Sequence, residues 1–347
     1  MIKELLEERN LPEIPKDKNE IKEILQREIY GYMPSKPESV SFEKISAIEE
    51  RFPCGASLNQ MKCLFTYKGK TGEFLFKTAL HSDGEKHPVF IHINFRADTP
   101  DLYQPTEEIL DGGFDVISVN YKDVTSDDTD FTTGIAPIFV VPGERTGSTT
   151  GKINIWSWAA SRLIDYALTL PATDTENIAV VGHSRLGKTA LVTGMHDERV
   201  KYTISNDSGC AGAAIARKNT GETVEAISRV FPHWFCPNYR KYADNEEQMP
   251  FDQHFLLAST APRYVYIASA SLDSWACPVN EYLSCHAVSE YFKEHGTAGF
   301  IAKDALPEEN EYFHDGSVGY HLRPGAHFLS RYDWNMYMKF IKGKMKK

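Results

Sequence analysis

The sequence has no long apolar run, few cysteines and no excess of basic residues, and each absence excludes a class of protein. No stretch approaches the roughly 18 consecutive apolar residues of a membrane-spanning helix. The six cysteines lie far apart without a CxxC pair, which is not the pattern of a disulfide framework or a zinc site. The net charge of −10 leaves no basic surface for nucleic acid. We therefore expect neither a membrane nor a nucleic acid as partner.

Signals for targeting and for domain boundaries are also missing. Residues 1–9 carry charges where a signal peptide needs an apolar stretch. We therefore expect a cytoplasmic protein with free thiols, although an export signal removed from the chain would leave the same pattern. There are no internal repeats and no linker rich in proline, glycine or serine, so we expect one domain over residues 1–347. Within it, we expect residues 1–80 to form an N-terminal helical and hairpin extension and residues 81–347 to form the core of the domain.

Hydrophobic periodicity predicts an α/β fold. Helical spacing of apolar residues appears at 19–32, and two short apolar runs around Gly69 predict an antiparallel hairpin over 60–79. Further on, short buried strands alternate with helices, which is typical of a mostly parallel, twisted sheet covered on both faces, a three-layer sandwich. We expect the strands at 88–95, 114–121, 177–181, 202–205 and 263–269, and the helices at 155–170, from 186, at 279–294 and at 330–341.

Residues 182–189 allow two functional interpretations. Read as G-x-x-x-x-G-K-[ST], the segment is a phosphate-binding loop of a nucleotide-binding protein. Read as a strand–turn–helix, it is a nucleophile elbow, in which Gly182 permits a sharp turn that exposes the hydroxyl of Ser184. The usual G-x-S-x-G is not complete, because Leu186 stands in its fifth place.

The order of residues along the chain favours the elbow. A phosphate-binding loop normally follows the first strand of its sheet, whereas several expected strands precede Ser184. Asp207 is only a weak candidate for the acid that would hold Mg²⁺. A hydrolase of this fold needs an acid and then a late histidine after its serine. Asp273 follows the strand expected at 263–269, and His327 precedes the last helix, so the order is met.

Six segments carry a further signal, namely 182–188, 205–214, 221–223, 231–236, 252–254 and 273–275. Together they resemble segments of the glucuronoyl esterases, which are carbohydrate esterases of the α/β-hydrolase fold. The resemblance covers roughly residues 85–340, and its most specific part is the elbow with an arginine directly after the serine. The resemblance implies a serine carboxylesterase that needs no cofactor. Such an enzyme cleaves (4-O-methyl)glucuronate esters between xylan and lignin alcohols, with glucuronoxylan fragments as its substrate.

Residue roles follow from this chemistry. Ser184 attacks the ester, and His327 serves as general base and then as general acid. The resemblance implies that Arg185 stabilises the oxyanion with its positive charge. It also implies that three side chains hold the sugar, namely Lys188, Glu222 and Trp275. Trp234 is either part of the core or a wall of the pocket.

Some assignments stay open. Relatives carry a glutamate as the triad acid in the segment that matches 206–209, so Asp207 is the alternative to Asp273, which we favour. His321 is a less favoured rival of His327, and we expect His183 to be structural and the acidic run at 127–130 to be a solvated loop. The other histidines lack metal-ligand spacing, so we expect no metal site. The alternative functions are an acetyl xylan esterase or other carbohydrate esterase and, from another class, a nucleotide-binding protein.

Overall fold

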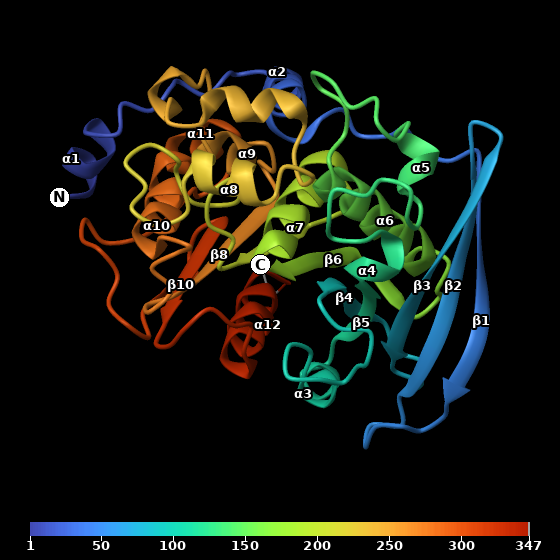
Figure 1. The fold of residues 1–347 in the computed structure, drawn as a ribbon. Helices are drawn as coiled ribbons and strands as arrows, with labels where there is room; N and C mark the ends of the chain where they lie inside the picture. Colours follow the sequence, from blue (N-terminus) through green and yellow to red (C-terminus); the bar gives the residue numbers. More distant parts are fainter. Residues whose placement is uncertain (346–347) are drawn as a thin grey trace.

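One ten-stranded sheet runs through the molecule (Figure 1). The structure is a computed structural model, and it describes residues 1–345. In the sheet the strand order is β1-β2-β3-β5-β4-β6-β7-β8-β10-β9. The strands are β1 (Ser39–Ile48), β2 (Ser57–Tyr67), β3 (Lys70–Leu80), β4 (His87–Asn94), β5 (Asp115–Asn120), β6 (Thr173–His183), β7 (Tyr202–Asn206), β8 (Tyr264–Ala270), β9 (Tyr312–Phe313) and β10 (Val318–Arg323).

Helices cover both faces of this sheet. The long ones are α2 (Lys18–Leu25), α6 (Lys152–Ala167), α7 (Arg185–His196), α10 (Pro278–Ala287) and α12 (Arg331–Met345). The short α-helices are α1 (Ile2–Glu7), α3 (Thr106–Asp111), α4 (Tyr121–Val124), α5 (Ala136–Phe139), α8 (Val224–Val230), α9 (His254–Ala258) and α11 (Ser289–Glu294). A π-helical turn, η1 (Gln26–Tyr30), and two 3₁₀ turns, η2 (Pro237–Tyr242) and η3 (Glu246–Gln248), complete the set among residues 1–345. No helix in this range is long and apolar enough to cross a membrane.

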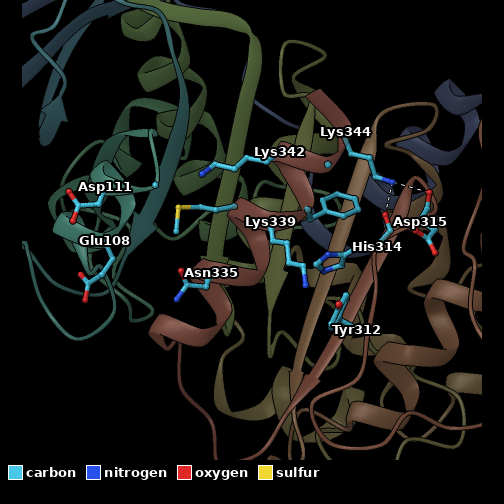
Figure 2. Close-up of a pocket in the computed structure, with 13 residues that line it drawn as sticks. Glu108, Asp111, Tyr312, His314, Asp315, Asn335, Lys339, Lys342 and Lys344 are labelled. Atoms are coloured by element: carbon cyan, nitrogen blue, oxygen red, sulfur yellow. Dashed lines mark hydrogen bonds between the residues drawn. The ribbon is translucent and has the colours of Figure 1, made fainter. Parts of the chain in front are cut away.

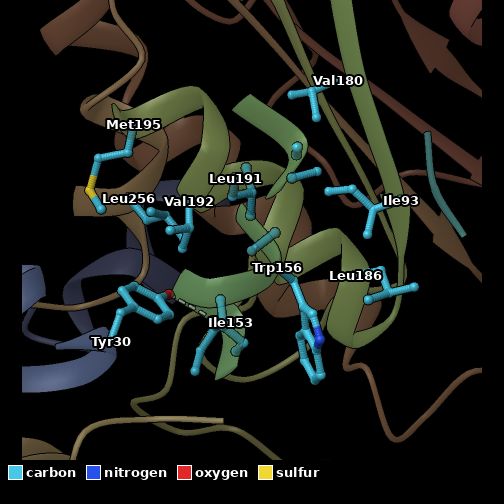
Figure 3. Packing of buried hydrophobic residues seen from close by; sticks show 14 of the residues in the cluster. Tyr30, Ile93, Ile153, Trp156, Val180, Leu186, Leu191, Val192, Met195 and Leu256 are labelled. Atoms are coloured by element: carbon cyan, nitrogen blue, oxygen red, sulfur yellow. Dashed lines mark hydrogen bonds between the residues drawn. The ribbon is translucent and has the colours of Figure 1, made fainter. Parts of the chain in front are cut away.

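The expected three-layer α/β architecture is confirmed. Strands β5, β4, β6, β7, β8 and β10 are parallel, while β1, β2, β3 and β9 pair in the antiparallel sense. Successive residues of a strand point to opposite faces, so each parallel strand serves two cores. On β6, Val180 belongs to the cluster under α6 and α7 (Figure 3), whereas Val181 belongs to the cluster under α3 and α12.

The N-terminal hairpin has the expected position, and it is longer than expected. Tyr67 pairs with Lys70, and the two residues between them, Lys68 and Gly69, both have positive φ (49° and 73°). Two such residues form the tight turn whose twist matches that of a hairpin. β3 continues the sheet by pairing with β5, and Phe65 and Phe76 pack in the same cluster as α6. The N-terminal segment is thus part of the main sheet and of its core.

The structure differs from the sequence-based expectations in a few elements. Strands β1, β9 and β10 were not expected, and the helix expected at 279–294 is two helices, α10 and α11, separated at Val288. Four adjacent parallel strands, β6, β7, β8 and β10, end at the same edge of the sheet. The segments that directly follow them carry Ser184, Asp207, Asp273 and His327. Ligands of open α/β sheets bind outside this carboxyl edge, so the functional site is expected there.

Candidate active site

Ser184 occupies a sharp turn between β6 and α7. Its φ of 57° and ψ of −128° are unusual for a residue with a side chain, and such strain is found where function holds a residue in place. A Cβ on Gly182 would lie 2.1 Å from the carbonyl oxygen of Leu186, so only glycine fits there. Helix α7 begins at Arg185, directly after the serine. The segment is therefore a nucleophile elbow, and there is no open loop here to surround a phosphate.

An acid–histidine pair lies at the same edge. His327 Nδ1 donates to Asp273 Oδ2 at 2.5 Å, while the histidine side chain remains 41% exposed and that of Asp273 only 4%. This geometry fixes the ring through one nitrogen and leaves Nε2 free to take a proton. Of the two candidate acids, Asp273 is thus the one in direct contact with His327.

Asp207 lies beside this pair and has different partners. Its Oδ1 accepts from the backbone N–H of Ala270 at 2.8 Å, and its Oδ2 lies 3.4 Å from Arg323 Nη2. Complete burial, reinforced by the nearby charges of Glu281 and Asp333, raises the pKa of Asp207 well above its ordinary value. Among residues 1–345, Asp207, Asp273 and His327 have ligand-type atoms within 4.8 Å of one another. A metal ion there would compete with the hydrogen bond that orients His327.

Two other histidines, His183 and His321, have structural partners. His183 packs against His327 with ring centroids 4.3 Å apart, and its Nδ1 donates to Asn206 Oδ1 at 2.6 Å. Burial and the neighbouring His327 lower the pKa of His183 to about 3, so His183 stays neutral beside His327. His321 is completely buried on β10, where it hydrogen-bonds Tyr266 and Asp333. It has no access to a substrate, in contrast to His327.

Arg185 projects into a cluster of aromatic rings. Its guanidinium carbon lies 4.6 Å from the ring centroid of Trp234 and 5.3 Å from that of Phe231. Nη1 forms an ion pair with Asp127, whereas the buried Nε has no hydrogen-bond partner within the described residues. The arginine is therefore held in place by Asp127 and the aromatic rings, and 24% of its side chain remains exposed.

Asp127 corrects the expectation of a solvated loop at this residue. Its side chain is only 8% exposed, and Oδ1 accepts from Trp234 Nε1 at 2.7 Å and from His233 Nε2 at 3.0 Å. Burial raises its pKa, but the hydrogen bond from His233 and the charge of Arg185 outweigh burial, so the pKa of Asp127 falls below its ordinary value. Tyr121, six residues away, also donates to Oδ2 at 3.2 Å, but Arg185, His233 and Trp234 are 58 to 107 residues away in the chain, so no local sequence signal identified this role.

The residues expected to bind the sugar form one connected chain. Lys188 Nζ, on α7, donates to the carbonyl oxygen of Ser208 and to Glu222 Oε2 at 3.0 Å. Glu222 Oε1 in turn accepts from Trp275 Nε1 at 3.1 Å, and the Trp275 side chain is 53% exposed. The fourth expected residue, Trp234, is buried between Phe231, which stacks on it at 3.9 Å, and Arg185. It therefore forms a wall beneath the arginine.

A separate cavity lies on another part of the surface. It has a volume of about 850 Å³ and is bounded by α3, β9 and α12 (Figure 2). Lys344 borders it and donates to the carbonyl oxygens of His314 and Asp315. None of its lining residues belongs to the Ser184 site, so the cavity gives no information about the chemistry at the carboxyl edge.

Known proteins resemble this chain in sequence. The family model described as "Glucuronyl esterase, fungi" matches residues 65–296. A carbohydrate esterase named MZ0003, from an unknown prokaryote, is 45% identical over 190 residues, which cover 55% of this chain and 44% of that protein. A 4-O-methyl-glucuronoyl methylesterase of Podospora anserina is 28% identical and is matched over 76% of this chain and 52% of its own length. The chain thus spans about half the length of these curated relatives.

Solved structures extend the likeness to nearly the whole chain. A glucuronoyl esterase from Solibacter usitatus superimposes with a TM-score of 0.85 at 32% identity, covering 94% of this chain and 92% of that one. A structure described as a promiscuous CE15 esterase, from a marine bacterial metagenome, gives 0.83 at 31% identity and covers 94% and 90% of the two chains. The family match over residues 65–296 includes the elbow and the segments after β7 and β8.

Proposed function

Because the chain belongs to the glucuronyl esterase family, we propose that it is a serine esterase that hydrolyses esters of 4-O-methyl-glucuronate, with glucuronoxylan fragments as substrate. The observation that carries the proposal is that α7 joins the chemistry to the recognition of the sugar. The helix follows directly on Ser184, and one turn later it holds Lys188, which is bonded to Glu222 and through it to Trp275. A sugar held by these groups has its ester beside the nucleophile.

The reaction proceeds by acyl transfer to the serine. His327 takes the proton of Ser184 Oγ as the oxygen bonds to the ester carbonyl carbon, and Asp273 stabilises the imidazolium that forms. The same imidazolium then gives its proton to the departing alcohol, which leaves an acyl-enzyme. A water molecule, activated by His327, attacks this acyl-enzyme and releases the glucuronate and the free serine.

Negative charge on the carbonyl oxygen is stabilised by Arg185 in two ways. As the first residue of α7, it has a backbone N–H without an acceptor inside the helix, at the positive end of the helix dipole. Its side chain adds a positively charged guanidinium, and 24% of this side chain is exposed. Donors aimed at the developing oxyanion stabilise the transition state more than the neutral ester, which is what raises kcat.

Sugar specificity follows from the Lys188–Glu222–Trp275 chain. A buried ion pair presents charged hydrogen-bonding groups of both kinds, which suit the neighbouring hydroxyl groups of a pyranose. The exposed indole of Trp275 offers an apolar face to the C–H groups of the ring. An acetyl group on xylan would place the sugar on the alcohol side of the ester, where it would not meet these residues in the same way.

The test compares the hydrolysis of three esters by the wild-type protein. We expect methyl 4-O-methyl-glucuronate to be cleaved with the highest kcat/KM, above methyl galacturonate and acetylated xylan. Ser184→Ala should abolish activity, on the order of 10⁶-fold by analogy with other serine hydrolases, without loss of Tm. A preference for acetylated xylan would replace the proposal by the acetyl esterase. Stabilisation by several degrees with Mg-ATP would restore the nucleotide-binding interpretation.

A further inference from the structure

The loop that carries His327 has no secondary structure of its own. Residues 324–330 link β10 to α12 and include neither helix nor strand, and Gly325 has a φ of 112°. From outside the loop, the backbone N–H of Leu272 donates to the carbonyl oxygen of Gly325 at 2.9 Å. A loop of this kind moves unless its carbonyl groups are held by donors. The position of the base therefore depends on what else holds these carbonyls.

Arg323 holds three of them. Its Nη2 donates to the carbonyl oxygen of Ala326 at 2.9 Å and to that of Phe328, the two residues on either side of His327. Its Nη1 donates to the carbonyl oxygen of Pro324 at 3.2 Å. The whole residue is only 5% exposed, so these bonds do not compete freely with water.

The arginine is itself fixed by buried acids from other elements. Its Nε donates to Asp333 Oδ2 at 3.0 Å, and the same oxygen accepts from the backbone N–H of Ser330 at 2.7 Å, where α12 begins. Nη2 also approaches Asp207 Oδ2 at 3.4 Å, and Oδ1 of Asp207 accepts from the N–H of Ala270 at the end of β8. One guanidinium thus connects the ends of β7, β8 and β10 with the first turn of α12.

We propose that Arg323 is the positioning residue of the catalytic histidine. By binding the carbonyls before and after His327, it keeps the imidazole in line between the carboxylate of Asp273 and the hydroxyl of Ser184. The inference rests on the proposed function, because it assumes that His327 is the base. Arg323 does not touch the substrate in this proposal, so its effect passes entirely through the histidine.

A lysine cannot take over this task. It would keep a positive charge beside Asp333 and Asp207, so that neither buried acid loses its counter-charge. An ammonium group on a flexible stem lacks the planar fork that reaches several carbonyls and a carboxylate at once. Displacements of about 1 Å in a catalytic group are enough to lower the rate by about 10²-fold. Arg323→Lys therefore separates the positioning of His327 from simple charge balance.

The experiment compares Arg323→Lys with Arg263→Lys. Arg263 is matched because its guanidinium also donates to three carbonyls, those of Gly194, Asp197 and Val200, but at the opposite edge of the sheet, before β8. We expect Arg323→Lys to lower kcat for methyl glucuronate roughly 10- to 100-fold with KM almost unchanged. Arg263→Lys should lower Tm by a similar amount and leave kcat unchanged.

A second readout follows the histidine directly. The proton shared by His327 Nδ1 and Asp273 should give a low-field ¹H NMR signal in the wild type, assigned by its absence in His327→Ala. This signal should weaken or shift upfield in Arg323→Lys and persist in Arg263→Lys. If Arg323→Lys does not fold, Asp333→Asn, which keeps the arginine but removes the charge that anchors its Nε, should show the same two changes at smaller amplitude.

The outcomes distinguish this inference from the proposed function. An Arg323→Lys protein with wild-type kcat and an unchanged low-field signal would overturn the positioning role, whatever its Tm. A wild-type protein that cleaves no glucuronate ester but keeps the low-field signal would overturn the proposed function. In that case the signal in Arg323→Lys still decides whether the arginine positions the histidine.

Discussion

The carboxyl edge of the parallel strands and the antiparallel strands β1–β3 are built on different principles. In β2 and β3, side chains alternate between the core and the surface, and an ion pair such as Lys62–Glu73, at 3.0 Å, lies on the outer face. At the carboxyl edge, charged groups such as Asp207 and Arg323 are buried together. Non-glycine residues with positive φ also occur there, including Ser184, Asp207 and Cys277.

The difference shows that the carboxyl edge contains features that lower the stability of the fold but that a functional site requires. Burying a charge or holding a residue at positive φ costs free energy, of order 1–3 kcal/mol for each strained residue. In β2 and β3 the charged side chains remain near water, and the positive φ values are confined to the turns, as at Lys68. Functional groups of the carboxyl edge, in contrast, keep their position only through many long-range hydrogen bonds. Changes at this edge should therefore affect turnover strongly, and changes on the outer face of β3 should not.

The largest effect is expected at the acid in contact with the base. Asp273→Asn removes the carboxylate that holds His327 Nδ1, so kcat should fall on the order of 10⁴-fold, the scale known for such a change in other triads. Asp207→Asn should lower kcat far less, since Asp207 binds Ala270 and Arg323 and not the imidazole. Steady-state kinetics on methyl glucuronate measures both, and the reverse ranking would assign the triad acid to Asp207.

The next effect concerns Arg185. Arg185→Ala should lower kcat by roughly 10²–10³-fold, the usual scale for the loss of one oxyanion donor, with a smaller change in KM. Arg185→Lys should restore only part of the activity, because an ammonium lacks the planar donor fork. Asp127→Asn is the control, since it removes the ion pair but leaves the guanidinium. An Arg185→Ala variant with raised KM and unchanged kcat would make Arg185 an anchor for the substrate.

The same contrast explains what could be predicted from the sequence. The hairpin over β2 and β3, the strand–helix alternation and the elbow at Ser184 all have local signals, namely periodicity and turn residues. β1 was not predicted because a register shift between Lys44 and Ser46 interrupts its alternation of apolar and polar residues. β10 was not predicted because the polar residues His321 and Arg323 interrupt its apolar pattern. In the fold, both side chains are hydrogen-bonded by Asp333.

The candidate site could be predicted only as far as the order of its residues along the chain indicates it. Ser184 and Asp273 could be proposed because each follows a strand that the pattern predicts, and His327 because it precedes the last predicted helix. The environment of Asp127 could not, since its buried partners come from distant segments. The sequence also left the acid open between Asp207 and Asp273. Only the three-dimensional arrangement brings one of them, Asp273, to within 2.5 Å of His327.

Low pH should destabilise the protein through histidines outside the antiparallel strands, because β1–β3 contain no histidine. Burial lowers the pKa of His92 to about 4 and that of His196 to about 3. A depressed folded pKa means that the native state binds fewer protons than the unfolded chain. The stabilising contribution is therefore present above pH about 6.5 and is lost as the pH falls towards the folded pKa. At pH 5, each of these two histidines should lower the free energy of unfolding by about 2 kcal/mol relative to pH 7.

Urea unfolding at pH 7 and pH 5 measures this loss. His92→Gln should make the free energy of unfolding less sensitive to pH over this range. His81→Gln should do the opposite, because the hydrogen bond to Asp115, at 2.8 Å, raises the pKa of His81. A raised folded pKa contributes stability that is fully present below about pH 6.5 and is lost above it. Equal pH sensitivity of both variants would contradict the assignment.

The smallest effect is expected on the outer face of β3. Leu75 is 38% exposed, whereas the next residue, Phe76, is 2% exposed and packs edge-on against Tyr166 with ring centroids 5.1 Å apart. Leu75→Thr keeps a residue that favours strands, so the free energy of unfolding should change by less than about 0.5 kcal/mol and kcat not at all. Phe76→Ala is the control and should cost about 3–5 kcal/mol of stability. Its kcat at a temperature where it is folded should equal that of the wild type, since the Phe76 ring packs against Phe42 and Tyr166 and not against the groups proposed to act on the ester. A fall in kcat in either variant would mean that the antiparallel strands are coupled to the carboxyl edge, and that the two regions are not independent.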